Sequence, residues 1–144
     1  MNVLILGAGG REHAFSWKIS QSPILGNLYI APGNPGTAQC GTNLAIGVTD
    51  FEGIVAAIRT HGISLVVVGP EEPLVKGVYD FFEQDAQLQR IIVVGPSAKA
   101  AQLEGSKEFA KEFLMKHNIP TAAYDSFTAE TVEKGCAFLE TLQP

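Results

Sequence analysis

The stretch VLILGAGGREHA, residues 3–14, decides the fold class of this chain. Residues 2–7 form a short apolar run closed by glycine, which is typical of a buried parallel strand. The turn that follows, GAGG, contains three glycines and permits a tight change of direction. Residues 11–22 then carry apolar side chains, among them Phe15 and Ile19, at helical spacing. The stretch therefore predicts a strand, a glycine turn and a helix.

Strands and helices keep alternating beyond this unit. Asp50 is the expected N-cap of a helix, and Gly62 its expected end. Such alternation is typical of βαβ units, so we expect an α/β fold, a Rossmann-like parallel sheet with helices on both faces. The further strands are predicted at residues 28–33, 43–47, 64–70 and 90–97, and the helices at 51–62 and 74–84.

Glycine-containing loops follow four of these strands. Because crossovers between parallel strands are right-handed, the loops that leave the strands lie together at the carboxyl edge of the sheet. A small-molecule crevice at that edge is the expected binding site. The loops are residues 7–10, 33–36, 69–73 and 95–97.

Composition and charge exclude several classes of protein. The chain has 144 residues, 46% of them hydrophobic, which suits a globular domain with a core. Its net charge is −5 without a stripe of Lys and Arg, and no apolar run approaches the roughly 20 residues of a membrane helix. We expect neither a nucleic-acid nor a membrane partner, and the N-terminus lacks a basic signal-peptide region. Cys40 and Cys136 form no CxxC motif, so we expect two idle thiols in a cytoplasmic protein.

The pattern changes near residue 104. Residues 106–120 predict an amphipathic helix with Ser106 as its N-cap. An edge strand is expected at residues 121–127 and a helix at 128–142. A helix, a strand and a helix cannot easily close a core alone. We therefore divide the chain into a first domain, residues 1–103, and the truncated beginning of a second, residues 104–144.

The glycine turn departs from the dinucleotide-binding fingerprint. That fingerprint, G-x-G-x-x-G, needs a third glycine and an acidic residue about 20 positions later. Here the third position is Glu12, and the second strand ends in IAPG without an acid. A carboxylate at Glu12 would also repel a pyrophosphate. Two other interpretations stay open: a helix N-terminus whose free N–H groups bind a phosphate or carboxylate, and a turn whose glycines serve packing only.

Polar side chains follow two other strands. Residues 31–37 are rich in turn formers, and we expect them to fold over the carboxyl edge or to form an ordinary surface loop. The segment GPEEPL places Glu71 and Glu72 at the end of the most apolar strand. Carboxylates held in a stiff loop beside a crevice can accept hydrogen bonds from the hydroxyl groups or an amine of a ligand. The alternative interpretation is that both are solvated acids near a helix N-terminus. His13 is expected on the helix surface rather than as a catalytic base.

A set of motifs carries a resemblance to a known family. VLILGAGGREHA, APGNPGT, VVVGPEEPL, VVGPS and SKEFAKEFLMKHNIPTA resemble, in order and spacing, the amino-terminal portion of the phosphoribosylamine–glycine ligases, also called glycinamide ribonucleotide synthetases. The resemblance runs from residue 1 to at least Tyr124. GGREHA followed by GPEEPL is far more specific than a glycine pattern alone. The resemblance implies an ATP-grasp enzyme that begins with a Rossmann-like pre-ATP-grasp domain.

The reaction implied by this resemblance is an ATP-dependent carbon–nitrogen ligation. It joins glycine to 5-phosphoribosylamine in de novo purine biosynthesis, with Mg²⁺ or Mn²⁺ at the phosphates. The family's metal-binding carboxylates and most of its ATP-binding residues lie beyond position 144, so we expect this chain alone to be inactive. Lys107 matches the position where ATP-grasp enzymes direct a lysine toward nucleotide phosphate, and a solvated helix lysine is the alternative.

The resemblance also places the phosphoribosylamine site at the glycine-loop edge. The turn and the start of the first helix would lie beside the ligand, and an amide would line the loop above. The two carboxylates would hold ribose hydroxyls or the amine. The candidate residues are Gly9, Gly10, Arg11, Asn34, Glu71 and Glu72.

Two further functions stand as alternatives. A stand-alone nucleotide- or NAD-binding Rossmann module is disfavoured by Glu12 and by the missing ribose acid. A non-catalytic interaction domain would show an apolar surface patch, and the sequence offers one only at the face left open by the missing domains. We expect that face to drive self-association of the chain.

Overall fold

The computed structural model of this chain describes residues 1–142 and contains one five-stranded sheet. All strand pairs are parallel, and the strand order is β3-β2-β1-β4-β5. The chain divides into two compact units, Met1–Ala101, which holds the sheet, and a second that begins at Gln102. The strands are β1 (Asn2–Gly7), β2 (Leu28–Pro32), β3 (Thr42–Asn43), β4 (Ile63–Val68) and β5 (Ile92–Val94).

The apolar strand β1 forms the centre of the sheet. Ile5 pairs with Ile30 of β2 on one side and with Val67 of β4 on the other. Leu4, Ile5 and Leu6 are completely buried, as the continuous apolar run predicts for a strand covered on both faces. The predicted strand at residues 2–7 is therefore confirmed without a change of bounds.

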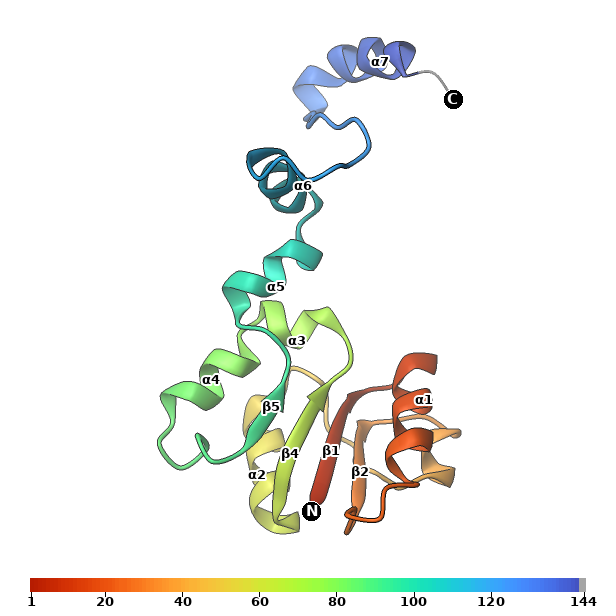
Figure 1. The fold of residues 1–144 in the computed structure, drawn as a ribbon, viewed down its shortest axis with the longest axis vertical. Coiled ribbons are helices and arrows are strands. Elements are labelled where there is room, and N and C mark those ends of the chain that lie inside the picture. Colours follow the sequence, from red (N-terminus) through yellow and green to blue (C-terminus); the bar gives the residue numbers. More distant parts are fainter. Residues whose placement is uncertain (143–144) are drawn as a thin grey trace. The chain divides into compact units, whose positions relative to one another are not determined.

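Helices cover both faces of the sheet (Figure 1). On one face the core includes Leu6, Val66 and Ile54, with side chains from α2 (Phe51–His61), α3 (Glu71–Val75) and α4 (Val78–Gln84). On the other face, Val3, Ile5, Leu28 and Ile30 form a smaller cluster, against which Ile19 of α1 (Gly10–Ile19) packs. The predicted α/β class, a Rossmann-like parallel sheet with helices on both faces, is confirmed.

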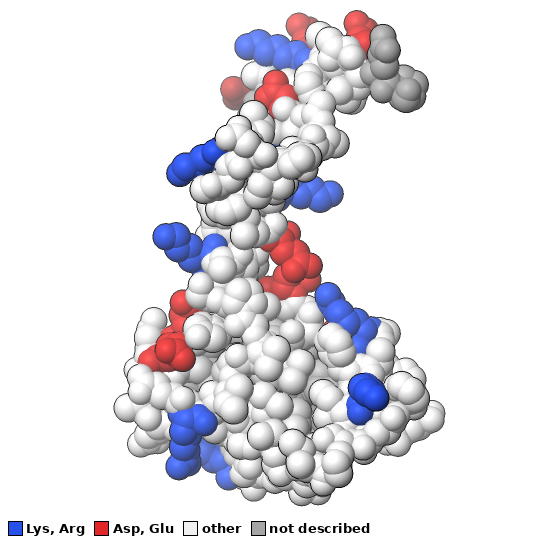
Figure 2. Space-filling view, in the orientation of Figure 1, with Lys and Arg blue, Asp and Glu red and all other residues white. Residues whose placement is uncertain are grey.

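The β4–β5 part of the α1 face is not covered by a described helix. Leu65 pairs with Ile92, and Val67 with Val94, so these four side chains lie on the same side of the sheet. Ile92 is 56% exposed and Val94 is 51% exposed. In Figure 1, α2 lies behind β4 and β5 while no helix lies in front of them, and the same area in Figure 2 carries no charged side chain. We call Leu65, Val67, Ile92 and Val94 the open face.

Helix ends in the first unit follow local sequence signals. The Asp50 carboxylate accepts a hydrogen bond from Gly53 N at 2.9 Å, and Gly62 ends α2 in the left-handed conformation with φ of 59°. Both predicted caps are confirmed. The single helix predicted at 74–84 is wrong, because Gly77 with φ of 88° separates α3 from α4.

The four strands after β1 and the first helix are shorter than predicted, β2 and β4 by only one residue each. The third strand covers only Thr42–Asn43 rather than 43–47, and β5 covers Ile92–Val94 rather than 90–97. Helix α1 ends at Ile19 rather than at residue 22. A strand extends only as far as its neighbour offers backbone partners, and β3 pairs with just two residues of β2.

The second unit is helical and has little core. Helix α6 (Lys107–Lys116) begins after Ser106, whose Oγ accepts a hydrogen bond from Phe109 N at 3.2 Å, so the predicted cap is confirmed. The predicted strand at 121–127 is wrong, because the described residues offer it no partner strand. No residue of α6 or α7 (Val132–Thr141) is buried in the described part of the chain. The remaining helices are α5 (Ala98–Gly105), η1 (Thr37–Gln39) and η2 (Ala129–Thr131).

Within residues 1–142, none of the helices is both long and apolar enough to cross a bilayer.

Candidate functional site

The carboxyl ends of β1 and β4 meet where the strand order reverses. In the order β3-β2-β1-β4-β5, the chain adds β2 and β3 on one side of β1 and then adds β4 and β5 on the other side. Ligands of open α/β sheets bind in the crevice at such a point. Gly69 N donates to Leu6 O at 3.0 Å, so the loop after β4 lies directly beside the loop after β1. This edge is the candidate site.

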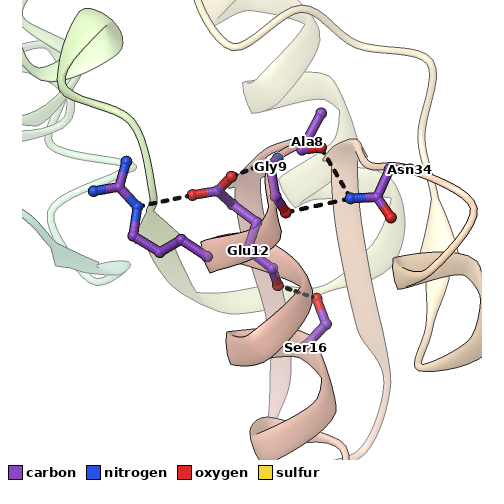
Figure 3. Close-up of polar contacts among 6 residues, drawn as sticks. Ala8, Gly9, Glu12, Ser16 and Asn34 are labelled. Carbon is purple, nitrogen blue, oxygen red and sulfur yellow. Dashed lines mark hydrogen bonds and ion pairs between the residues drawn. The ribbon is translucent and has the colours of Figure 1, made fainter.

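Glu12 is buried at the centre of this edge. Only 4% of the residue is exposed, and its Oε2 accepts a hydrogen bond from Gly9 N at 2.6 Å (Figure 3). Its Oε1 lies 3.2 Å from Nε of Arg11, whose side chain is mostly exposed. Glu12 is the third residue of α1, the position from which a carboxylate reaches back to the N-cap N–H. The acidic side chain thus binds the backbone of its own turn.

Glycines from two loops enclose the Glu12 side chain. A Cβ built at Gly7 would lie 2.5 Å from Glu12 Cγ, and one built at Gly9 would lie 2.8 Å from Oε2. A Cβ at Gly69 would overlap Glu12 Oε1. Because real Cβ atoms do not approach so closely, all three positions require glycine while Glu12 keeps this conformation. The glycines of the turn therefore make room for a side chain of the protein itself.

The inward face of α1 differs from the prediction. Its buried residues are Glu12 and Ser16, whereas Phe15 is 38% exposed and Trp17 is 59% exposed. Ser16 Oγ donates to Glu12 O at 2.7 Å, which satisfies the buried hydroxyl (Figure 3). Apolar spacing suggested Phe15 for the inward face, but the contact with the turn requires the carboxylate there. Ile19 is partly buried, as its spacing suggested.

Asn34 connects the loop after β2 to the glycine turn through hydrogen bonds. Its Nδ2 donates to Ala8 O at 2.9 Å and to Gly9 O at 3.3 Å (Figure 3). Its Oδ1 accepts from Gly36 N at 2.8 Å and from Thr37 N at 3.0 Å. Both ends of the amide are occupied within the protein, so Asn34 holds two loops of the edge together.

His13 lies outside this network, on the exposed surface of α1. Its ring packs against Gly36, where a built Cβ would lie 2.7 Å from Cε1. The prediction of a helix-surface histidine agrees with this position.

The carboxylates after β4 begin helix α3 and are exposed. Glu72 Oε1 accepts from Lys76 Nζ at 2.7 Å, an ion pair across one helical turn. The Glu71 carboxylate has no hydrogen-bonding or ionic partner among residues 1–142. Glu71 is therefore the more available of the two for a ligand.

The predicted site residues fall into two groups. Gly9, Gly10 and Arg11 form the start of α1, and Asn34 contacts their turn. The loop that carries the two glutamates adjoins the same turn through Gly69, so the sheet brings the six candidates to one edge. Lys107 is the first residue of α6 in the second unit.

The sequence analysis does not predict that Glu12 is buried in the turn. A signal for it exists, because a Glu at the third helical position is the usual sign of a carboxylate that hydrogen-bonds back to the N-cap.

A second concavity lies at the opposite end of the strands. A cavity of about 300 Å³ includes Arg59, Arg90 and Gln87 and adjoins Ile63, the first residue of β4. Ligands of parallel sheets bind at the carboxyl ends of strands, so we keep the β1–β4 edge as the candidate site.

Metal ligands are not clustered in the part of the chain that the structure describes. No group of three or more His, Cys, Asp or Glu side chains there could hold a metal ion. Cys40 and Cys136 are free thiols.

The residues that form this edge lie within a match to a known family domain. The family model of the phosphoribosylglycinamide synthetase N domain matches residues 1–104, which include the turn, Asn34 and both glutamates. The chain belongs to this family. Phosphoribosylamine–glycine ligases from Yersinia pestis and Vibrio cholerae are 50% and 52% identical to it over 96% and 89% of its length. The chain spans 32% and 29% of those relatives, about a third of their length.

Solved structures agree with the family assignment. The phosphoribosylamine–glycine ligase of Thermotoga maritima is similar over 96% of this chain and 30% of its own, with a TM-score of 0.68 and 30% identity. The N5-carboxyaminoimidazole ribonucleotide synthetase of the same organism shares the fold, with a TM-score of 0.61 and 19% identity over 95% of this chain and 36% of its own. The fold of this chain is therefore shared by a solved member of the family.

Proposed function

We propose that this chain is the substrate-binding amino-terminal part of a phosphoribosylamine–glycine ligase. The observation that carries the proposal is the match of the family's N domain to residues 1–104, with its glycine turn and GPEEPL loop at one edge of the sheet. The complete enzyme would be an ATP-dependent carbon–nitrogen ligase of de novo purine biosynthesis. ATP would phosphorylate the glycine carboxylate, and the amine of 5-phosphoribosylamine would displace the phosphate.

The phosphoribosylamine site is proposed at the β1–β4 edge. Gly10 is exposed and open, with no described atom within 4 Å of a built Cβ, so a ligand can approach the backbone there. Arg11 offers an exposed guanidinium, and Glu71 offers an exposed carboxylate without a partner among the described residues. Hydroxyls and an amine are donors that suit the Glu71 carboxylate. Gly9 and Asn34 support this edge, and Glu72 can join it when its pair with Lys76 opens.

The ATP site is proposed to include Lys107, which begins α6 at the N-terminal end of that helix. A helix N-terminus and a lysine both favour phosphate. Mg²⁺ or Mn²⁺ would offset the charge of the nucleotide phosphates in the complete enzyme. We propose that the chain alone is inactive, because it spans only 32% and 29% of the ligases that it matches.

The division of the chain follows from the same proposal. We assign residues 1–103 to the pre-ATP-grasp domain and residues 104–144 to the beginning of an ATP-grasp domain. The end of the family match at residue 104 and the change of compact unit after Ala101 support this division. The free thiols Cys40 and Cys136 suit a reducing compartment, and we propose a cytoplasmic enzyme that acts on small molecules. Self-association through the open face is proposed for this chain.

The experiment that tests the substrate site is calorimetric titration of this chain with glycinamide ribonucleotide, the stable product. We expect saturable binding that Glu71→Gln weakens about tenfold, because a charged hydrogen-bond partner is lost. Glu83→Gln, a change of an exposed glutamate in α4, is the matched control and should leave binding unchanged. Equal affinity of the wild type and Glu71→Gln would remove the proposed role of Glu71. No binding by the wild type would contradict a ligand site formed by this chain alone.

A further inference from the structure

Glu12 occupies the position where the carboxyl edge of a parallel sheet ordinarily receives an anion. The N-terminus of α1 directs backbone N–H groups at the end of β1, an arrangement that favours phosphate or pyrophosphate. Here the Gly9 N–H donates to the Glu12 carboxylate at 2.6 Å. The side chain is buried between glycines 7, 9 and 69, from the loops after β1 and β4.

We propose that Glu12 is a specificity-determining residue that acts as a built-in anion and closes this turn to pyrophosphate and phosphate ligands. The exclusion rests on the geometry of the turn and not on the proposed function. Its consequence for phosphoribosylamine does rest on the proposed function: the ligand approaches the turn through its hydroxyls or amine, and its phosphate lies away from the N-terminus of α1.

Space and charge both support the exclusion. The Glu12 side chain fills the volume beside Gly7 and Gly69 so closely that neither position has room for a methyl group. A pyrophosphate in this volume would require the carboxylate to leave, which would break its bonds to Gly9 N and Arg11 Nε. A pyrophosphate beside the retained carboxylate would meet a like charge at close range in a poorly solvated site, where the repulsion is weakly screened.

The sequence pattern offers a direct test through one substitution. Residues 7–12 read GAGGRE, so Glu12→Gly creates the complete G-x-G-x-x-G fingerprint. Inorganic pyrophosphate is the probe, and binding is measured by calorimetry and by amide chemical shifts. We expect no saturable binding to the wild type. Glu12→Gly should bind saturably, with a dissociation constant at least about tenfold below the highest pyrophosphate concentration at which the wild type shows no binding, because a negative charge is removed and helix N–H groups are freed.

Ser16→Gly is the matched control for that substitution. It removes the other buried polar side chain of the same helix face and leaves the turn filled by Glu12. It should not gain pyrophosphate binding, so a gain confined to Glu12→Gly separates anion exclusion from loss of helix stability. A folded Glu12→Gly variant without increased binding would overturn the proposal.

Two measurements keep the proposal testable if Glu12→Gly does not fold. In the wild type, pyrophosphate should leave the amide shifts of Gly9, Gly10 and Arg11 unchanged, and saturable shifts there would overturn the proposal. Glu12→Gln keeps the size of the side chain and should also fail to bind, whereas binding by this variant would contradict the occupied-volume argument. A wild type that binds neither pyrophosphate nor glycinamide ribonucleotide leaves the exclusion intact and contradicts only the proposed ligand site of this chain by itself.

Discussion

At the scale of single residues, the site depends on close contacts around Glu12 and Asn34. The Glu12 carboxylate contacts Gly9 N at 2.6 Å, and the Asn34 amide contacts two carbonyls and two N–H groups. Buried polar groups remain stable only when they are hydrogen-bonded in this way. The same contacts make the surrounding glycines sensitive to substitution, but not equally, because each lies at a different distance from Glu12.

Gly69→Ala and Gly10→Ala should differ in the free energy of unfolding. A methyl group at Gly69 would overlap Glu12 Oε1, so we expect a loss of about 1–3 kcal/mol as the buried carboxylate is displaced. At Gly10, where no described atom lies within 4 Å of the added Cβ, the change should stay within about 0.5 kcal/mol. Urea denaturation followed by circular dichroism measures both. Equal losses for the two variants would contradict the packing of Glu12 against Gly69.

At the scale of elements, turns determine where each helix begins and which residues it presents. Gly77 separates α3 from α4 with φ of 88°, although apolar spacing continues across it. Glu71 and Glu72 therefore begin a separate helix of five residues, α3, whereas the prediction placed them before a single helix at 74–84. The start of α4, directly after α3, therefore depends on a backbone conformation that few residues adopt.

Gly77→Ala should destabilise the first unit by about 1–2 kcal/mol, because an L-residue with a Cβ is strained in the left-handed region. Gly77→Asn should lose less, since asparagine adopts this conformation more readily. Thermal unfolding of both variants gives the comparison. The prediction fails if alanine is tolerated as well as asparagine, which would mean that this turn does not need a left-handed residue.

At the scale of the whole molecule, the first unit leaves the apolar side chains of the open face uncovered by any described helix. Parallel sheets are ordinarily covered on both faces, yet Ile92 and Val94 are more than half exposed. The chain also spans only about a third of its curated relatives, at 32% and 29%. An apolar face of this kind favours association when copies of the chain meet.

Val94→Lys should weaken self-association of the chain by about tenfold or more, because a charge replaces an apolar side chain in the contact. Val75→Lys makes the same change on α3, where the valine is 39% exposed, and should leave association unchanged. Sedimentation velocity over a concentration series measures both variants. A wild type that stays monomeric at millimolar concentration would rule out association through the open face.

Local sequence determined much of this protein by itself. The apolar runs of β1 and β4, the Asp50 and Ser106 caps and the Gly62 stop depend on neighbouring residues, and the structure confirms them. The placement of glycine loops at one edge follows from parallel topology alone. These features suffice for the fold class, whereas the family resemblance rests on the motifs GGREHA and GPEEPL.

Tertiary structure decided the contacts between distant segments. Apolar spacing favoured Phe15 for the inward face of α1, but the glycines of two loops admit Glu12 instead. The strand predicted at 121–127 is absent from the described residues because a strand needs a neighbour to bond its backbone. Asn34 likewise contacts a turn 25 residues away. Periodicity reports which side chains avoid water, whereas close packing and hydrogen-bond partners depend on segments that only the fold brings together.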